Sequence, residues 1–424
     1  MEHKILARYP LGNPRRTWRQ DNFILSTFQC KGENMRDAME NIAETGLNLL
    51  EMGWCTHEQA WEAVHLAEEL QIDIIFQDFS VFGGMQERNV ERSITPAIAR
   101  EVANKLRPWK HVIGYYVWDE PYHDEDLVQA RAQIDMLLAE DPTAIAFSCA
   151  IPSYNSLYKW ENGEFPAYLR RYADMIEPPA LSLDYYPIGN TKYYSEEAQL
   201  DNSLFWYDLE MMRKVCREKT LPLWFYHQTF DRFSTEHFIY PMARMMMYAA
   251  VMYGAKGLQN FTAPSSITNS KGAKGRYFNE TKEINAEFIK LGNTLMALDS
   301  KFVIHSDDLV PGFDHPEGKS DKMEDSTLLC GKLPTRISVG ELWDEYGNKY
   351  LLVLNRDYHK EADISLDLKE ASRTYLVSKV TGRQELVCDS TKTLDVKLSP
   401  GDGCLYRIQN ADEEAFTIEY RIEK

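Results

Sequence analysis

The sequence predicts an α/β protein, a (β/α)8 TIM barrel followed by a small antiparallel β-sandwich. Between residues 23 and 300, eight short β-branched and aromatic runs alternate with eight helical runs, at a repeat of about 33 residues. Beyond residue 300, short runs with period-2 alternation and turn signals replace this rhythm, which indicates antiparallel strands. We therefore divide the 424 residues into an N-terminal arm (1–22), a catalytic barrel (23–300) and a C-terminal β-sandwich (301–424).

The barrel strands are predicted from apolar runs that end in polar or glycine residues. They lie at Phe23–Cys30, Leu47–Gly53, Ile72–Phe79, Val112–Trp118, Thr143–Cys149, Ala180–Tyr185, Leu221–Thr229 and Lys256–Thr262. Helices are predicted between them at Asn34–Thr45, His57–Leu70, Thr95–Trp109, Asp124–Glu140, a stretch ending at Ile176, Asp201–Lys219, Ser234–Tyr253 and Glu280–Asp299. Gly46 is a good terminator of the first helix, and Thr95 with Pro96 forms an N-cap followed by proline at the first helical position.

The tail and the arm are predicted from different signals. The tail strands are expected at Thr335–Leu342, Tyr350–Leu354, Ala362–Leu366, Thr374–Val380, Thr393–Leu398 and Cys404–Ile408. The polar first 22 residues carry four arginines and are expected to lie over the barrel or a partner. A doubly wound open sheet is the competing fold, and it is disfavoured because Gly32 and Gly46 are isolated rather than part of a phosphate-binding loop.

Composition limits the partners and the compartment. A formal net charge of -18 argues against binding to nucleic acid or to an anionic membrane surface. We find no apolar signal segment at the start and no run long enough to span a membrane. Seven dispersed cysteines without a C-x-x-C pair fit reduced thiols better than disulfides or a zinc site. We expect a cytoplasmic protein with no nucleic-acid or membrane partner. The sequence does not decide between a monomer and a homo-oligomer.

The stretch from Gly114 to Pro121 is the motif on which the functional prediction depends. An apolar, aromatic strand ends here in two adjacent carboxylates, Asp119 and Glu120. Burying either charge unpaired would cost several kcal/mol, so the pair must face water, a cation or a substrate. A strand that simply exits into solvent is the plainer alternative, but the aromatic flanks and the barrel setting favour a functional site.

Active sites of TIM barrels lie at the C-terminal ends of the strands. The polar and aromatic residues expected there are Gln29, Glu33, Glu51, Trp54, Gln77, Asp78, Asp119, Glu120, Ser148, Asp184, Tyr185, Tyr186, Tyr226, His227, Gln228, Asp231, Gln259 and Asn260. Such an acidic, aromatic and amide-rich mouth suits a neutral polyhydroxylated substrate whose reaction passes through a cation-like centre. We predict no metal and no cofactor, because metal-ligand spacings and phosphate-loop patterns are absent.

The motifs resemble those of a known enzyme group. Strand 4 ending in an acid followed by Glu resembles clan A glycoside hydrolases, in which an Asn-Glu pair ends that strand and its Glu is the acid/base. The run Gly-Tyr-Tyr-Val-Trp-Asp-Glu-Pro is similar to β-galactosidase-like members with Asp-Glu-Pro there, as are Leu183–Pro187, Tyr253–Phe261 and the tail runs Tyr350–Arg356 and Leu398–Gly403. The resemblance implies a glycosidase with Glu120 as general acid/base, and with Asp119 binding a sugar hydroxyl or raising the pKa of Glu120.

One departure leaves the second carboxylate open. Clan A enzymes carry a nucleophilic Glu at the end of strand 7, whereas Leu223–Thr229 holds no carboxylate and Asp231 is the first beyond it. Glu51 and Asp231 are therefore the leading candidates for the second carboxylate. The alternatives are a substrate-assisted N-acetylhexosaminidase-type reaction or an inactive carbohydrate-binding barrel. The residues expected to bind the carbohydrate are Trp54, Asp78, Trp118, Asp184, Tyr185, Tyr226, His227, Gln228 and Asn260.

Overall fold

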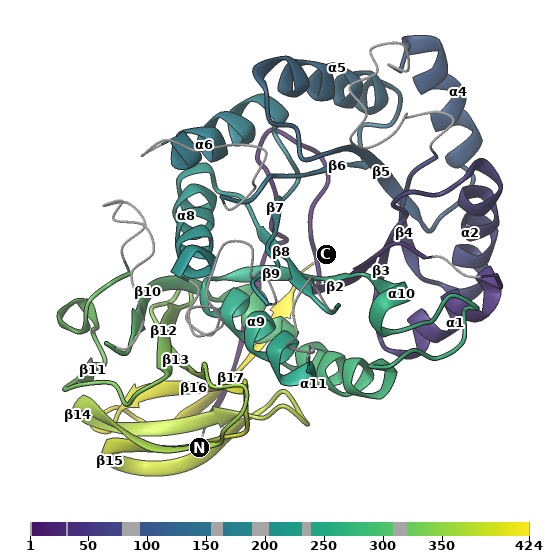
Figure 1. The fold of residues 1–424 in the computed structure, drawn as a ribbon. Coiled ribbons are helices and arrows are strands. Elements are labelled where there is room, and N and C mark those ends of the chain that lie inside the picture. The colour runs from purple at the N-terminus through teal and green to yellow at the C-terminus, as the bar shows by residue number, and fades with distance from the viewer. Residues whose placement is uncertain are drawn as a thin grey trace.

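The computed structural model describes residues 2–30, 33–78, 94–153, 164–188, 203–230, 239–307 and 320–423. Parallel strands form a barrel with helices around it, and an antiparallel β domain lies beside the barrel (Figure 1). The predicted fold class is confirmed.

The barrel is a closed sheet of eight parallel strands. They are β2 (Ile24–Phe28), β3 (Leu49–Glu51), β4 (Asp73–Phe76), β5 (Val112–Asp119), β6 (Ile145–Cys149), β7 (Leu181–Asp184), β8 (Leu223–Gln228) and β9 (Ala255–Phe261). Neighbours in the chain pair with each other, and β9 pairs back to β2. Between β6 and β7 the sheet closes through a single parallel bridge, Ala150 to Leu183, where the Ala150 N–H donates to the Ser182 carbonyl at 2.9 Å.

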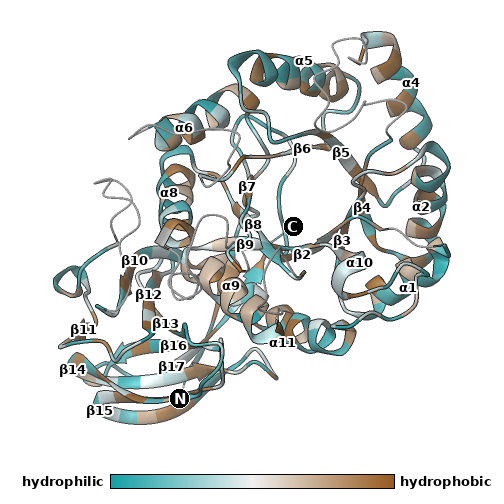
Figure 2. Ribbon diagram, viewed as in Figure 1, coloured by the Kyte–Doolittle hydropathy of each residue, from teal (hydrophilic) through white to brown (hydrophobic). Residues whose placement is uncertain are grey.

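Helices follow the strands and surround the barrel. They are α1 (Met35–Glu44), α2 (His57–Leu70), α4 (Pro96–Leu106), α5 (Asp124–Glu140), α6 (Glu164–Ile176), α8 (Ser203–Lys219), α9 (Tyr240–Met252), the short α10 (Ala263–Ser266) and α11 (Phe278–Ala297). The Thr95 side chain caps α4 and Pro96 is its first residue, as predicted. Hydrophobic residues lie along the barrel strands, and many helices carry both hydrophobic and hydrophilic sides, as expected of helices packed on a core (Figure 2).

Alternation along the strands separates two cores. One side chain in two faces the lumen, where residues such as Phe28, Phe147 and Trp224 pack together. The residues between them, such as Tyr115 and Phe225, pack against the helices. This alternation decides which polar side chains at the strand ends can reach the inside of the barrel.

The β domain is one curved antiparallel sheet. Its strands are β10 (Asp299–His305), β11 (Leu329–Cys330), β12 (Ile337–Trp343), β13 (Lys349–Asn355), β14 (Ala362–Val377), β15 (Gln384–Leu398) and β16 (Gly403–Asn410), with a short 3-10 helix at Met323–Asp325. The order is β10-β12-β13-β16-β14-β11, and β15 pairs with β14. Two predicted strands are parts of β14, whose register shifts between Asp367 and Ser372, so the strand is bent and continuous.

The arm joins the two ends of the chain and closes the bottom of the barrel. Strand β1 (Glu2–Arg8) pairs in parallel with β17 (Phe416–Ile422). Further along, the buried Gln20 amide accepts a hydrogen bond from the Trp224 indole at 2.9 Å and donates to the Lys256 carbonyl at 2.6 Å. The Trp18 ring packs edge-on against Trp224, with centroids 6.0 Å apart. The arm is therefore bonded to the N-terminal ends of β8 and β9.

We expect Gln20→Ala to destabilise the protein, because it leaves the buried Trp224 N–H and the Lys256 carbonyl without partners. The free energy of unfolding should fall by about 2–4 kcal/mol, as one or two buried polar groups lose their hydrogen bonds. Urea unfolding measures this loss. Gln129→Ala on α5, a half-exposed glutamine, is the matched control and should change stability by less than about 0.5 kcal/mol. Equal losses in the two variants would contradict the role of the arm.

Candidate active site

A bulge in β5 turns Asp119 toward the lumen. Tyr116 pairs with Phe147 of β6, but the pairing then shifts, so Trp118 pairs with Ser148 and Asp119 with Cys149. Regular alternation would have placed Asp119 on the face opposite Tyr116. Instead the Tyr116 hydroxyl, which belongs to the lumen core, donates a hydrogen bond to Asp119 Oδ1 at 3.0 Å. The bulge thus brings this carboxyl to the inner rim of the barrel.

Asp119 and Asp184 form an interacting pair across β6. Asp184 ends β7, and Cys149 lies between the two carboxyls, with its Sγ 4.0 Å from Asp184 Oδ1. Burial and then the negative charge of Asp184 raise the pKa of Asp119 to about 7, against the opposing hydrogen bond from Tyr116. Burial and the carboxylates Asp184, Asp119 and Glu120 also raise the pKa of the Cys149 thiol. Three carboxylates therefore gather around one buried cysteine.

Glu120 follows β5 in a left-handed backbone conformation. Its φ is 50°, and its N–H donates to the Cys149 carbonyl at 3.0 Å. Gln29 after β2 and Trp54 after β3 have φ values of 64° and 54°. Left-handed conformations of such residues cost about 1 kcal/mol or more each and cluster at functional sites. Three of them lie just beyond barrel strands at the mouth, and others, such as Gln71, lie elsewhere in the described chain.

Glu51 lies below the rim in a buried polar row. Its Oε1 accepts hydrogen bonds from Ser26 Oγ at 2.6 Å and from Gln259 Nε2 at 2.8 Å. Ser182 Oγ in turn donates to Gln259 Oε1 at 2.7 Å, so the row crosses the lumen from β3 to β7. Burial raises the pKa of Glu51 to about 7, although both hydrogen bonds favour the ionised form. This candidate for the second carboxylate is fully buried.

Sequence reasoning missed one carboxyl of this region, Asp208 on α8. It is fully buried, and its Oδ2 accepts from the Ser153 N–H at 2.9 Å. Burial raises the pKa of Asp208 to about 8, and Asp184 contributes to the increase. A single acid within the apolar run 204–209 was the signal that could have identified it.

Several buried polar atoms near the mouth have no hydrogen-bond partner within the described ranges. Four of them are Gln29 Nε2, Glu51 Oε2, Gln77 Nε2 and Tyr226 Oη, from residues at or near the carboxyl ends of β2, β3, β4 and β8. Native proteins pair most buried polar groups, and each exception requires an explanation. A ligand with several hydroxyl groups could both donate to and accept from such a set.

The aromatic residues expected to bind sugar lie in two different places. Trp54 is half-buried and stands edge-on to Phe28 at 5.1 Å and to Phe261 at 6.3 Å. Tyr226 also packs on Phe28 inside the lumen. Tyr185, in contrast, packs on Phe205 of α8, and Trp118 borders the core between strands and helices. The structure thus brings Trp54 and Tyr226 together at the mouth, away from the other two.

The remaining predicted binding residues make local contacts. His57 Nδ1 lies 2.7 Å from Asp78 Oδ2. The Gln228 amide bonds to both the N–H and the carbonyl of Ile188, and Asn260 accepts from Thr229 Oγ1 at 2.9 Å. Burial lowers the pKa of His227 to about 3. Asp231 lies outside the described residues.

The described ranges contain neither a metal-ligand cluster nor a membrane-spanning helix. No group of three or more His, Cys, Asp and Glu side chains there is placed to hold a metal ion. None of the helices there has the length and apolar character needed to cross a membrane.

A closed barrel with carboxylates at its rim and an attached β domain defines the class as a TIM-barrel protein. No family profile matches the chain, and no curated protein matches it. Two solved structures, both provisionally assigned alpha-galactosidases from Bacteroides fragilis, share the fold. One, also described as a melibiase, is 11% identical with a TM-score of 0.52, over 93% of this chain and 80% of that one. The other is 10% identical with a TM-score of 0.52, over 92% of this chain and 80% of that one. At these identities the likeness shows the fold alone, and the β-galactosidase-like group stays a prediction.

We expect Glu51→Gln to stabilise the protein at high pH. The pKa of Glu51 is about 7 in the folded protein and near 4.5 when unfolded, so its charge opposes folding increasingly between these values and fully above pH 7. The variant should gain about 1–3 kcal/mol at pH 8 relative to its difference from wild type at pH 4.5. Denaturant unfolding at both pH values measures this. Glu283→Gln, an exposed control on α11, should show no such pH dependence.

Proposed function

We propose that the protein is a glycoside hydrolase in which Asp119 and Asp184 are the two reacting carboxylates. The observation that supports this most is their interaction across Cys149, which adds to the effect of burial in raising the pKa of Asp119 to about 7. Glycosidases need one carboxyl that is protonated near neutral pH and a second that is ionised. Asp119 would protonate the leaving-group oxygen, and Asp184 would act as nucleophile or as base for water.

The mouth supplies the features that a sugar substrate requires. Trp54 offers an apolar ring at the rim, and polar atoms of Gln29, Gln77 and Tyr226 that find no partner among the described residues could bond to hydroxyl groups. Both similar structures bear the description alpha-galactosidase, so aryl α-galactosides are the first substrates to test, with β-galactosides beside them.

Glu120 remains the acid/base that the sequence resemblance implies. Burial is the main cause of the raised pKa values of Cys149 and of Tyr168 on α6, and the negative charge of Glu120 contributes to both increases. A carboxylate close to both the rim and α6 could serve the site directly or support Asp119. Variants of the three carboxyls distinguish these roles.

The end of β8 favours a departure from clan A chemistry. Gln228 stands there, and its amide is used to hold the Ile188 backbone. A substrate-assisted reaction would need no carboxylate at this position. Glycosides with and without a 2-acetamido group separate that reaction from the two-carboxylate one, because only the former would require the acetamide.

Removing either reacting carboxyl should greatly reduce the rate of hydrolysis. We expect Asp119→Asn and Asp184→Asn each to lower kcat/KM on an alkyl galactoside by about 100- to 10,000-fold, as the loss of general acid–base groups does. Glu120→Gln should cost less than about tenfold if Glu120 only supports Asp119, and as much as Asp119→Asn if it is the acid. Glu125→Gln on α5, which is exposed, is the control.

Near-wild-type turnover in Asp119→Asn or Asp184→Asn would contradict the assignment of that residue. Sugar binding by calorimetry without turnover of any glycoside would instead favour the carbohydrate-binding barrel.

The activity should fall as pH rises through about 7. The active form has Asp119 protonated, so kcat/KM should drop about tenfold per pH unit above the pKa of this group. Asp184→Asn removes a negative neighbour and should lower that pKa. Carboxyl carbon NMR of Asp119 follows the titration in both proteins, and Glu125→Gln at an exposed position of α5 is the control. The same titration midpoint in wild type and Asp184→Asn would show that the two carboxyls do not interact.

A further inference from the structure

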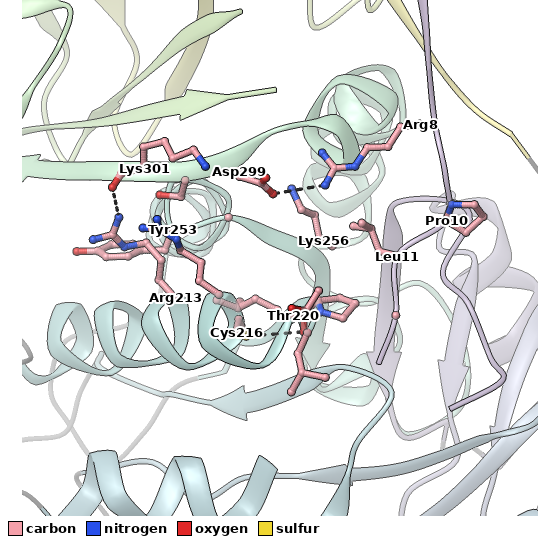
Figure 3. A pocket seen from close by; sticks show the side chains of 17 residues that line it. Arg8, Pro10, Leu11, Arg213, Cys216, Thr220, Tyr253, Lys256, Asp299 and Lys301 are labelled. Atoms are coloured by element: carbon pink, nitrogen blue, oxygen red, sulfur yellow. Dashed lines mark hydrogen bonds and ion pairs between the residues drawn. The ribbon is translucent and has the colours of Figure 1, made fainter. Parts of the chain in front are cut away.

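A second cavity lies at the opposite end of the barrel. It has a volume of about 430 Å³ and lies between the arm, the end of α8, the first residues of β8 and β9, and the start of β10 (Figure 3). Leu223 and Lys256 line this cavity, and both lie near the N-terminal ends of their strands. The charged residues that line it are Arg8, Arg213, Arg217, Lys256, Lys301 and Asp299.

The lining is cationic although the chain carries a net charge of -18. Among the described lining residues, five are Lys or Arg and one is a carboxylate. Such a local reversal of charge attracts anions.

Part of this positive charge has a structural use. Lys256 Nζ donates to the carbonyls of Leu295, at 2.6 Å, and Leu298, and Arg8 donates to the Ala297 carbonyl. These carbonyls lie at the C-terminus of α11, where cations are favourable. Asp299 lies 3.5 Å from Arg8 and balances that one charge.

Arg213 is also balanced. Its guanidinium lies 2.6 Å from Glu210 and 2.8 Å from Asp321, and it donates to the Lys301 carbonyl at 2.6 Å. It therefore contributes little net charge to the cavity.

Three cations remain in excess. Arg217 and Lys301 form no side-chain ion pair within the described ranges, and Figure 3 shows the Lys301 ammonium directed toward Asp299. The Lys256 ammonium has three donors and uses two on carbonyls. Burial lowers the pKa of Lys256 to about 7, Asp299 opposes this decrease and Arg8 adds to it, and a bound anion would oppose it further.

We propose that this cavity binds a phosphate group, either free phosphate or the phosphate monoester of a small polar molecule. A dianion matches the excess of Arg217, Lys301 and Lys256 better than a single carboxylate does. Guanidinium and ammonium groups form their strongest hydrogen bonds with such anions. The cavity volume leaves room for a small organic body beside the phosphate. This inference does not depend on the proposed glycosidase activity.

Thermal unfolding of the full chain tests the site. The additives are inorganic phosphate, a hexose 6-phosphate, the free hexose, and sodium chloride at matched ionic strength. The test variant is Arg217→Gln with Lys301→Gln, and its control is Lys110→Gln with Lys271→Gln, which removes the same two charges from exposed positions away from the cavity. We expect phosphate to raise Tm more than chloride does in wild type and control.

In the test variant, phosphate binding by calorimetry should be at least about tenfold weaker, which corresponds to about 1.4 kcal/mol. A response to the hexose phosphate alone that is lost in the test variant assigns the site to phosphate monoesters, and a response to both assigns it to the phosphate group itself. The proposal is overturned if chloride stabilises as much as phosphate. It is also overturned if the test variant and wild type respond alike, or if the free hexose gives the same shift.

Discussion

Closure of the barrel between β6 and β7 is the constraint on which the candidate site depends. The two strands meet through one bridge, Ala150 to Leu183, rather than through a full ladder. Cys149 and Asp184 are the neighbours of that bridge, and Asp119 pairs with Cys149 on the other side. The two carboxyls interact because the sheet closes at this level, so a shift of β7 by one residue would turn Asp184 away from the lumen.

The mouth is organised at the expense of stability. Glu51, Asp119 and Asp208 all have raised pKa values, with burial as the first cause. The ionised form of each carboxyl is therefore less stable here than it would be in water. A barrel that needed only to fold would fill these positions with apolar side chains, as it does lower in the lumen around Phe147 and Trp224. Titratable groups placed against their solvation are typical of sites that move protons, and the large apolar core elsewhere offsets their cost.

The sequence predicted the fold well because periodicity is a local property. Each barrel strand and helix is encoded by its own run of residues, so the order of elements could be read without knowing what each contacts. Strands β1 and β17 were not predicted, because a parallel pair between the two ends of the chain leaves no local signal in the sequence. Strand β14 was divided into two, since the bend near residues 367–372 contains polar residues that resemble a turn.

The site was harder to predict because one bulge changes which side chains face inward. Alternation read from the sequence groups Tyr116, Trp118 and Glu120 on one face, whereas the pairing shift after Tyr116 places Asp119 there. Bulges depend on the neighbouring strand and leave no clear pattern in a single sequence. The interaction of Asp119 with Asp184 joins strands that are separated by 65 positions along the chain, so no motif spacing could have indicated it.

The two ends of the barrel differ in how their charged groups are stabilised. The carboxyls at the mouth are poorly compensated, whereas the cations at the bottom are bonded to backbone carbonyls. At the mouth, burial and the neighbouring charge of Asp184 raise the pKa of Asp119. At the bottom, Lys256 and Arg8 donate to carbonyls at the C-terminal end of α11, and the arm bonds to β8 and β9 through Gln20. A cation held by backbone carbonyls cannot move far, so the bottom is a rigid surface on which excess positive charge can be kept. Strands β8 and β9 run from that surface toward the rim, and the fixed bottom therefore helps set the height at which Gln259 bonds to Glu51 and Ser182.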